Sequence, residues 1–566
     1  MVRSSESNRQ ETRTAPRAQA DFVREVFSLS ATDSLKRILS LDHPQGLIRS
    51  LSRVDFYWLL KKIGEEDSLP LLQMASYEQW QYLMDMELWK KDRMSFEEAS
   101  GWMTRLNQAD PGRLLQWLCT EGESFSCLYF SKMIRVEVRR TDEVYDLSDG
   151  FVTFDNLFFF KVLNPEDEEH IRNIFQLLAA AELERYQALL LGIQGTLPSE
   201  MEEELYRLRN VRLAEDGFLP YEEALSIYSR LKPESLKRNE KTSSLEFSPT
   251  PEEGILVPIT PIIHTETTSF FIESAGGISD PLFMDRIRVE FAGLCNQVIA
   301  ADGMEVNELE VLLKVCRRAA GYISLGLEKV SDKKLPLSEE FLRSNSLIDL
   351  FRVGYGLALE LKWEAEQWMK KAWFVRKSFG RDFWEEDWGG ILSGLLMTRP
   401  QLFVQTHAEE SYKDFENLSE IDDCHTILKG MVILDRLLEN IASQHTLKPA
   451  LEKRLQVTFS ALIFTYWARQ ELKIDPGFGP LAGDQVRNLF KKIRKGEKKP
   501  PYRLVDHEKV FIQTFSGYAS SLNAAGEMNW RETLSHLWQG FREEYALVKA
   551  ADVDPKFVRY ILVMTD

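Results

Sequence analysis

Apolar residues recur at helical spacing through the first 130 residues of the chain, and each run follows a residue that caps helices. The four start signals are Ser52 with Asp55, Ser76 with Gln79, Ser95 with Glu98, and Asp110 before Pro111. Helices of about ten residues do not persist alone in water, so neighbouring helices must cover their apolar faces. The pattern therefore predicts a mainly α fold in which residues 21–231 form a stack of short helix hairpins.

Five tryptophans lie on the apolar stripes of these predicted helices: Trp58, Trp80, Trp89, Trp102 and Trp117. Aromatic residues at helical spacing are ordinarily packing groups, so we predict that they form the core of the stack. The alternative interpretation is an aromatic cage that holds a ligand.

The period changes from helical to alternating near residue 134. Ile134, Val136 and Val138 alternate with charged residues, and the stretch "FVTFDNLFFFKV" follows with a turn signal at Asp155-Asn156. This pattern predicts a small antiparallel β insert at about residues 132–163.

Residues 232–280 are rich in Ser, Thr, Pro and Gly, which break regular structure, so we predict a connector and a domain boundary there. Long helical patterns beyond it predict a helical bundle over residues 281–566. Its longest predicted helices are 282–301, 308–329, 338–377, 419–440, 446–472, 506–523 and 530–549. Residues 1–20 carry four arginines among polar residues and are predicted to be a disordered tail.

The chain has 566 residues, 44% of them hydrophobic, and a formal charge of −18 from 70 basic and 88 acidic residues. A chain of this length is expected to form more than one packed unit. The negative charge argues against nucleic acid as a partner, because it repels a phosphate backbone. The basic run from Lys491 to Lys499 is predicted to be a solvated loop, since like-charge runs usually mark exposed segments.

Five scattered cysteines without a C-x-x-C pair predict neither a disulfide framework nor a zinc knuckle. Nowhere do about eighteen apolar residues follow one another, so no membrane span is expected. We therefore expect a cytoplasmic protein. Its oligomeric state is left open.

Sequence signatures of nucleotide loops, zinc proteases and serine hydrolases are absent, which argues against an enzyme without excluding one, and we predict no cofactor. In "IDDCHTI", Cys424 and His425 are adjacent and would point about 100° apart on a helix, so a helix start is predicted rather than a catalytic or metal site. In "DWGGILSG", Gly389 and Gly390 are interpreted as a helix break.

The stretch "MEEELYRLRNVRLAEDGFLPYEEALSIY", residues 201–228, combines a short apolar stripe with many charges. The residues of the predicted buried stripe are Met201, Leu205, Leu208 and Val211. Spacing of four residues pairs Glu203 with Arg207 and Arg212 with Asp216, which favours a helix hairpin whose charges are structural. The alternative is a binding site for an anion or a partner, formed by Arg207, Arg209, Arg212, Glu215 and Asp216.

The stretch "IAADGMEVNELEVL" resembles the Ala-Asp-Gly turn between helices of the tellurite-resistance TerB-like proteins. Its residues predict a helix that ends at Gly303 and a new start capped by Asn307 with Glu310. A metal site at Asp302 and Glu305 is the alternative, although hard cations need more oxygen ligands than these two supply.

Three segments together carry a wider resemblance: "LLKKIGEEDSLPLLQMASYEQWQYLMDMELWKKDRM", "YRLRNVRLAEDGFLPYEEALSIY" and "LFRVGYGLALELKWEAE". They resemble a bacterial family of large, acidic, mostly helical cytosolic proteins that is catalogued only as a domain of unknown function. The resemblance covers most of the chain from about residue 33, and it implies no activity, cofactor or catalytic residue.

Two functions fit these observations. The leading prediction is a non-enzymatic interaction or scaffold protein with a protein partner, because helix stacks commonly present extended binding surfaces. The alternative is a ligand-binding regulator or an enzyme, in which the arginine cluster between the two helical units binds an anion. Metal ligation is not predicted.

Overall fold

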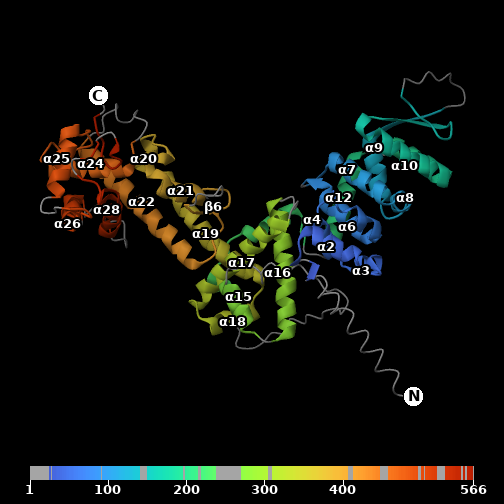
Figure 1. Cartoon of the computed structure of the whole chain (residues 1–566), viewed down its shortest axis with the longest axis horizontal. Helices are drawn as coiled ribbons and strands as arrows, with labels where there is room; N and C mark the ends of the chain where they lie inside the picture. Colours follow the sequence, from blue (N-terminus) through green and yellow to red (C-terminus); the bar gives the residue numbers. More distant parts are fainter. Residues whose placement is uncertain are drawn as a thin grey trace, which may run out of the picture. The chain divides into compact units, whose positions relative to one another are not determined.

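The computed structural model (Figure 1) describes residues 25–26, 28–90, 92–139, 150–195, 198–214, 218–237, 269–278, 280–303, 309–405, 412–445, 457–494, 499–502, 504–518, 530–549, 552–554 and 557–564. The protein is mainly helical, with short antiparallel strand pairs, as predicted. It divides into two compact units, residues 1–352 and 353–566.

The first unit begins with a series of short helices. They are α2 Ala31–Leu39, α3 Pro44–Ser50, α4 Arg53–Ile63, α5 Leu69–Met74, α6 Tyr77–Glu87, α7 Phe96–Ala109, α8 Pro111–Leu118, α9 Glu123–Met133, α10 Glu168–Ala181, α11 Leu183–Gly195 and α12 Pro198–Ala214. Between α6 and α7, strands β1 Trp89–Lys90 and β2 Arg93–Met94 form a small hairpin. Helices pack on near neighbours, for example α4 on α6 and α5 on α7.

The predicted helix starts of this series are confirmed. The side chains of Ser52, Ser76, Ser95 and Asp110 each accept a hydrogen bond from the backbone N–H three residues later. Four of the five tryptophans are core residues with at most 1% of their surface exposed: Trp58, Trp80, Trp102 and Trp117. The capped short helices therefore cover one another's apolar faces, as the apolar pattern indicated.

The predicted β insert is also confirmed. Strands β3 Ile134–Val138 and β4 Phe158–Val162 pair antiparallel, with Ile134 opposite Val162. Before β4, Asp155 Oδ1 accepts hydrogen bonds from the backbone N–H groups of Leu157 and Phe158, both at 2.9 Å, which forms the predicted turn. The short helix η1 Pro165–Asp167 then leads into α10.

The remainder of the first unit contains long helices. Its elements are α13 Tyr221–Ala224, η2 Leu225–Tyr228, η3 Pro233–Ser235, α15 Phe270–Gly276, α16 Pro281–Asp302, α17 Leu309–Ser331 and α18 Leu335–Ser344. Helices α13 and η2 pack on α16, and α16 packs on α17. At that contact Cys295 and Cys316 are buried, with their Sγ atoms 3.9 Å apart.

Most of the predicted connector, residues 238–268, lies outside the described residues, so the domain boundary predicted at 232–280 stays a prediction. The helices that follow it, up to Arg352, group with the N-terminal helices. The predicted disordered tail, residues 1–20, also lies outside the described residues.

The second unit is a group of helices around α22. Its elements are α19 Leu347–Met369, which begins in the first unit, α20 Trp373–Arg376, η4 Arg381–Trp384, α21 Glu385–Leu395, β5 Leu402–Phe403, β6 Tyr412–Lys413, α22 Leu418–Gln444, α24 Phe459–Glu471, α25 Gly483–Ile493, α26 Val505–Thr514, η5 Ser516–Tyr518 and α28 Trp530–Tyr545. Helix α22 packs against α20, α21, α24 and α28 (Figure 1). Aromatic side chains fill the core, where Phe464 lies 4.7 Å from Phe541 between ring centres.

Two local predictions for this part of the chain are wrong, and a third is wrong at one residue. The single helix predicted over 338–377 is three helices, because Ser346 caps a new start by accepting a hydrogen bond from the Asp349 N–H. Gly389 and Gly390 lie inside α21 and do not break it. Arg494, in the predicted solvated loop, is buried with its guanidinium 4.9 and 4.7 Å from the Phe490 and Tyr502 rings.

Candidate functional site

The three arginines of α12 point to three different surroundings. Arg207 is exposed and pairs with Glu204, with Nε–Oε2 at 2.8 Å and Nη2–Oε1 at 2.6 Å. Arg212 reaches α6 and forms two hydrogen bonds to the carboxylate of Asp85. Arg209 extends toward Trp89, whose ring centre lies 6.0 Å from the guanidinium carbon. Two of the three arginines are thus taken up by carboxylates, whereas Arg209 is not.

Two details of the predicted hairpin differ from the structure. Arg207 pairs with Glu204 instead of Glu203, and Val211 is 59% exposed instead of buried. The packed face of α12 contains Leu205 and Leu213 together with the half-buried Arg209 and Arg212, so the buried stripe is partly ionic. Glu215, Asp216 and Gly217 lie outside the described residues, so the Arg212–Asp216 pairing and the roles predicted for Glu215 and Asp216 stay predictions.

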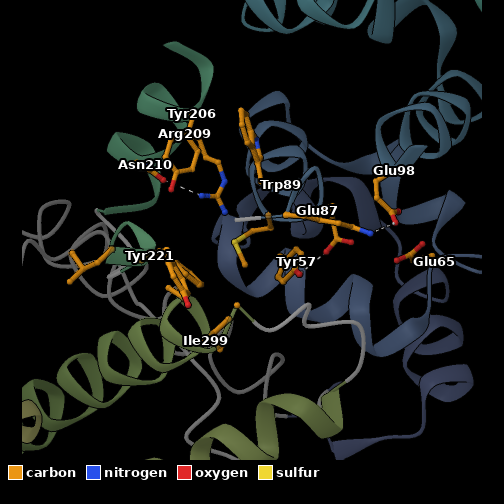
Figure 2. A pocket seen from close by; sticks show the side chains of 16 residues that line it. Tyr57, Glu65, Glu87, Trp89, Glu98, Tyr206, Arg209, Asn210, Tyr221 and Ile299 are labelled. Atoms are coloured by element: carbon orange, nitrogen blue, oxygen red, sulfur yellow. Dashed lines mark hydrogen bonds and ion pairs between the residues drawn. The ribbon is translucent and has the colours of Figure 1, made fainter. Parts of the chain in front are cut away.

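Arg209 lines a cavity of about 430 Å³ within the first unit (Figure 2). Its walls come from α4, α6, β1, α7, α12, the segment 218–221 and α16. The aromatic lining residues are Tyr57, Trp89, Tyr206, Phe218 and Tyr221. The charged ones are Glu65, Glu87, Lys90, Glu98 and Arg209. The cavity therefore combines flat apolar surfaces with ionic groups.

The charged groups are sorted across the cavity. Figure 2 shows Arg209 and Asn210 on one side, and Glu65 and Glu98 on the other, with Trp89 and Glu87 in between. Helix α12 carries the first pair, whereas Glu65 lies in the turn that follows α4 and Glu98 lies on α7. A bound molecule consequently meets different chemistry at its two ends.

Cations pair with each carboxylate on the other side of the cavity, and one of them, Lys61, is buried. Lys61 Nζ lies 2.7 Å from Glu87 Oε2 and 3.0 Å from Glu65 Oε1, and only 1% of its side chain is exposed. Tyr57 donates a hydrogen bond of 2.7 Å to Glu87 Oε1. Arg105 completes the group at 3.0 Å from Glu65 Oε2. Burial raises the pKa of Glu87 despite the Lys61 charge beside it.

Lys90 and Glu98, with Nζ–Oε1 at 3.7 Å, form a further pair on this side. Each carboxylate of the lining therefore has at least one cation within 4 Å. Lys61, Lys90 and Arg105 offset Glu65, Glu87 and Glu98 one for one.

Arg209 has no such partner among the described residues. Its Nε donates to the Asp85 carbonyl at 2.6 Å, and its Nη1 donates to Asn210 Oδ1 at 3.1 Å. Neither acceptor carries a charge, and Nη2 makes no hydrogen bond within the described part of the chain. Burial lowers the pKa of Arg209, against the opposing effect of the nearby Asp85 carboxylate that Arg212 binds. The Arg209 guanidinium therefore keeps the capacity to donate a further hydrogen bond to an acceptor in the cavity.

Sequence reasoning identified Arg209 as a candidate but missed its surroundings. Trp89 was predicted to be a core residue, and although it is only 9% exposed, it lines the cavity. Lys61 and Glu87 carried no signal, because 26 residues separate them and nothing in their spacing indicates contact.

A second polar cluster joins α7, α9 and α10. Ser100 Oγ lies 2.6 Å from Asp167 Oδ1 and 2.7 Å from the Tyr129 hydroxyl, which lies 3.1 Å from His170 Nε2. Asn164 Nδ2 donates to the other Asp167 oxygen at 2.7 Å. Burial lowers the pKa of His170. Ser100 is bonded to the carboxylate rather than to the imidazole, so the arrangement is that of a closed structural network instead of an activated nucleophile.

The remaining predicted positions behave as structural groups. Helix α22 begins at a capping box of Asn417 and Glu420, Cys424 is buried, and burial raises its pKa to about 12. His425 Nε2 lies 3.1 Å from Glu364 Oε2. A thiol with this pKa is not a nucleophile at neutral pH.

The predicted helix end at Gly303 is confirmed, with the left-handed φ of 57° and ψ of 32°. Asp302 before it accepts a hydrogen bond of 2.6 Å from Tyr228 and pairs with Arg318. The other members of this prediction, Glu305, Asn307 and the side chain of Glu310, lie outside what the structure describes. Over the described residues, no group of three or more His, Cys, Asp or Glu is arranged to hold a metal.

Within the same residues, every helix is too short or too polar to cross a bilayer.

Comparison with known proteins places the chain in one family. The protein belongs to the family described as "Family of unknown function (DUF6178)", which matches residues 11–564. This confirms the resemblance seen in the sequence and extends it over nearly the whole chain. No curated protein and no solved structure matches it.

Proposed function

We propose that the first unit binds a small anionic molecule in the cavity beside Arg209, and that the protein is a ligand-binding regulator. The observation that supports this proposal is the Arg209 guanidinium, which lines a cavity without a carboxylate bonded to it among the described residues. A half-buried cation without a bonded counter-ion is costly, and an anionic ligand offsets that cost.

The lining favours a polar ligand. Five charged side chains and the Asn210 amide reach the cavity, and its volume of about 430 Å³ falls within the roughly 300–1,000 Å³ of small-molecule sites. A purely apolar molecule would leave these groups without water or hydrogen-bond partners. The walls also come from three separate stretches of chain, 57–98, 206–221 and 299–303, so a ligand would contact all of them.

The test is binding of small anions to the full chain. Thermal unfolding and titration calorimetry with inorganic phosphate, sulfate and citrate should show stabilisation by at least one of them. Arg209→Met should weaken that binding about 10- to 100-fold, because a charge-assisted hydrogen bond contributes roughly 1.5–3 kcal/mol. Arg207→Met, two residues earlier on the same helix and paired outside the cavity, is the matched control and should bind as the wild type does.

Two results would overturn the proposal: no stabilisation by any anion, or equal loss of binding in both variants. Arg209→Lys separates charge from shape, and it should retain part of the affinity because it keeps the positive charge. Circular dichroism of each variant without ligand verifies that the fold is kept.

A role as an interaction or scaffold protein is the second proposal. It is supported by the packed series of short helices α2 to α12, since stacked helices commonly present extended binding surfaces. Crosslinking in the host followed by purification should recover one partner in fixed stoichiometry. Recovery of the protein alone under gentle conditions would count against it.

A further inference from the structure

We infer that the molecule bound beside Arg209 carries a flat aromatic ring that lies against Trp89, with its anionic group on the guanidinium. This inference rests on the proposed anion binding and adds the chemical class of the ligand. It is argued from the position of Trp89, from the other aromatic walls and from the carboxylate side of the cavity.

Trp89 and Arg209 are close enough to contact one ligand together. The Trp89 ring centre lies 6.0 Å from the Arg209 guanidinium carbon, so an anion on Arg209 holds its attached group next to the indole. Tyr206 packs on Trp89 with ring centres 5.5 Å apart and an interplanar angle of 47°, which fixes the orientation of the indole. A fixed aromatic ring beside a cation is the arrangement that binds flat anionic molecules in many sites.

Aromatic side chains form much of the rest of the wall. Phe218 and Tyr221, on the segment that follows α12, line the same cavity as Trp89 and Tyr206. Flexible aliphatic chains gain little from such surfaces, whereas a ring stacks on them at a small entropic cost, because it has few rotatable bonds. The aromatic lining thus selects a rigid, flat ligand over an extended flexible one.

The carboxylate side indicates what the far end of the ligand carries. Glu87 Oε1 accepts from Tyr57 and Oε2 from Lys61, and each carboxylate oxygen has a second lone pair for another donor. Because the charges on this side are offset one for one, an N–H or O–H group fits better than a second anion. The expected ligand is therefore a ring with one anionic group and with donor groups at its other end.

Two sources supply this chemistry, a nucleoside monophosphate and an amino- or hydroxy-substituted aromatic carboxylic acid. The test compares each with its ring-free anion on the full chain by titration calorimetry: adenosine monophosphate against inorganic phosphate, and 4-aminobenzoate against acetate. At least one ring-bearing anion should bind tenfold or more tightly than its ring-free partner. Its binding should also quench tryptophan fluorescence.

Variants of Trp89 assign the ring contact. Trp89→Leu should remove the preference for the ring-bearing anion while ring-free binding stays within about twofold. Trp89→Phe should restore most of the preference, which a merely destabilised cavity would not show. Trp363→Phe, at an exposed tryptophan of α19 in the second unit, is the control and should change nothing but the fluorescence baseline.

The outcomes separate this inference from the proposed function. If ring-bearing and ring-free anions bind equally and both depend on Arg209, the inference of an aromatic ring in the ligand is wrong, whereas the proposed anion binding is supported. If the ring is preferred equally in Trp89→Leu, the assignment to Trp89 is overturned. If no anion binds the wild-type chain, both the proposed anion binding and the inferred aromatic ligand are wrong.

Discussion

Arg212 and Asp85 join α12 to α6 through two parallel hydrogen bonds, Nε to Oδ2 at 2.6 Å and Nη2 to Oδ1 at 2.7 Å, although 127 residues separate them in the chain. Asp85 is 4% exposed, so protein groups surround its carboxylate and Arg212 is its ion-pair partner. The pair holds α12 in place beside α6, and it thereby sets where Arg209, three residues earlier, enters the cavity.

Replacing Arg212 by methionine should destabilise the contact between α6 and α12. The change leaves the Asp85 carboxylate buried without its ion-pair partner, which we expect to cost about 3 kcal/mol, the lower end for buried pairs, because Arg212 is partly exposed. Hydrogen exchange of peptides from α6 and α12 measures the loss. Arg207→Met should leave the exchange unchanged, and equal behaviour of the two variants would contradict the role given to the pair.

The stability of α4 should fall as the pH rises from about 4 to 7. Burial raises the pKa of Asp55 to about 7 from its ordinary 3.8. A raised carboxyl pKa means that its contribution is fully present below pH 3.8 and is lost as the pH rises through 7, by up to roughly 4 kcal/mol.

Asp55→Asn removes the ionisation and keeps an oxygen that can accept from Ser52. The variant should therefore be more stable than the wild type at pH 8, with a difference that shrinks toward pH 4. Hydrogen exchange in α4 at pH values across this range checks it, with exchange rates corrected for pH. A difference independent of pH would show that Asp55 is not the titrating group.

The hydrogen-bond network around Asp167 predicts that removal of the Ser100 hydroxyl lowers the free energy of unfolding. Ser100→Ala removes a donor to the Asp167 carboxylate and a contact of the Tyr129 hydroxyl, so we expect about 1–3 kcal/mol of destabilisation. Calorimetric unfolding provides the measurement. Ser131→Ala is the control, because within the described part of the chain the Ser131 hydroxyl bonds only to the Leu128 carbonyl, so its loss should cost less. Equal costs in the two variants would argue against a network effect.

Gly394 in α21 should not tolerate alanine. A Cβ at this position would lie 2.5 Å from the Gln401 carbonyl oxygen, which is backbone and cannot turn away, so we expect a loss of about 1–3 kcal/mol. Gly293→Ala in α16 is the contrasting case, since no described atom beyond the adjoining α16 backbone lies within 4 Å of the added Cβ, and helix propensity favours alanine. The midpoint temperature of thermal unfolding should fall in Gly394→Ala and should not fall in Gly293→Ala.

The helix starts of the first unit could be predicted because the signals are local. A serine and its partner three residues later, as in Ser76 and Gln79, determine where a helix begins almost independently of the rest of the chain. The burial of the tryptophans could be predicted from the same periodicity.

The glycines of α21 were predicted wrongly because the contact that requires them is not local in sequence. The β5–β6 hairpin lies against that helix, so that a Cβ on Gly390 would lie 2.7 Å from the Phe403 ring.

The candidate site could be predicted only in part for the same reason. The arginine run drew attention to α12, but sequence spacing assigned Arg207 and Arg212 to partners on their own helix. The structure gives Arg212 a partner on α6, and what distinguishes Arg209 is the absence of a bonded carboxylate among the described residues. Such an absence depends on every surrounding element, so no local pattern reports it.

The buried thiols of α16 and α17 provide an internal chemical reporter. Cys295 and Cys316 are 0% and 2% exposed, so an alkylating reagent reaches them only when the two helices separate. Helix α16 also supplies Ile299 and Ala300 to the cavity wall. The rate of labelling at Cys295, read by mass spectrometry, therefore reports how often this part of α16 becomes exposed, without any engineered probe.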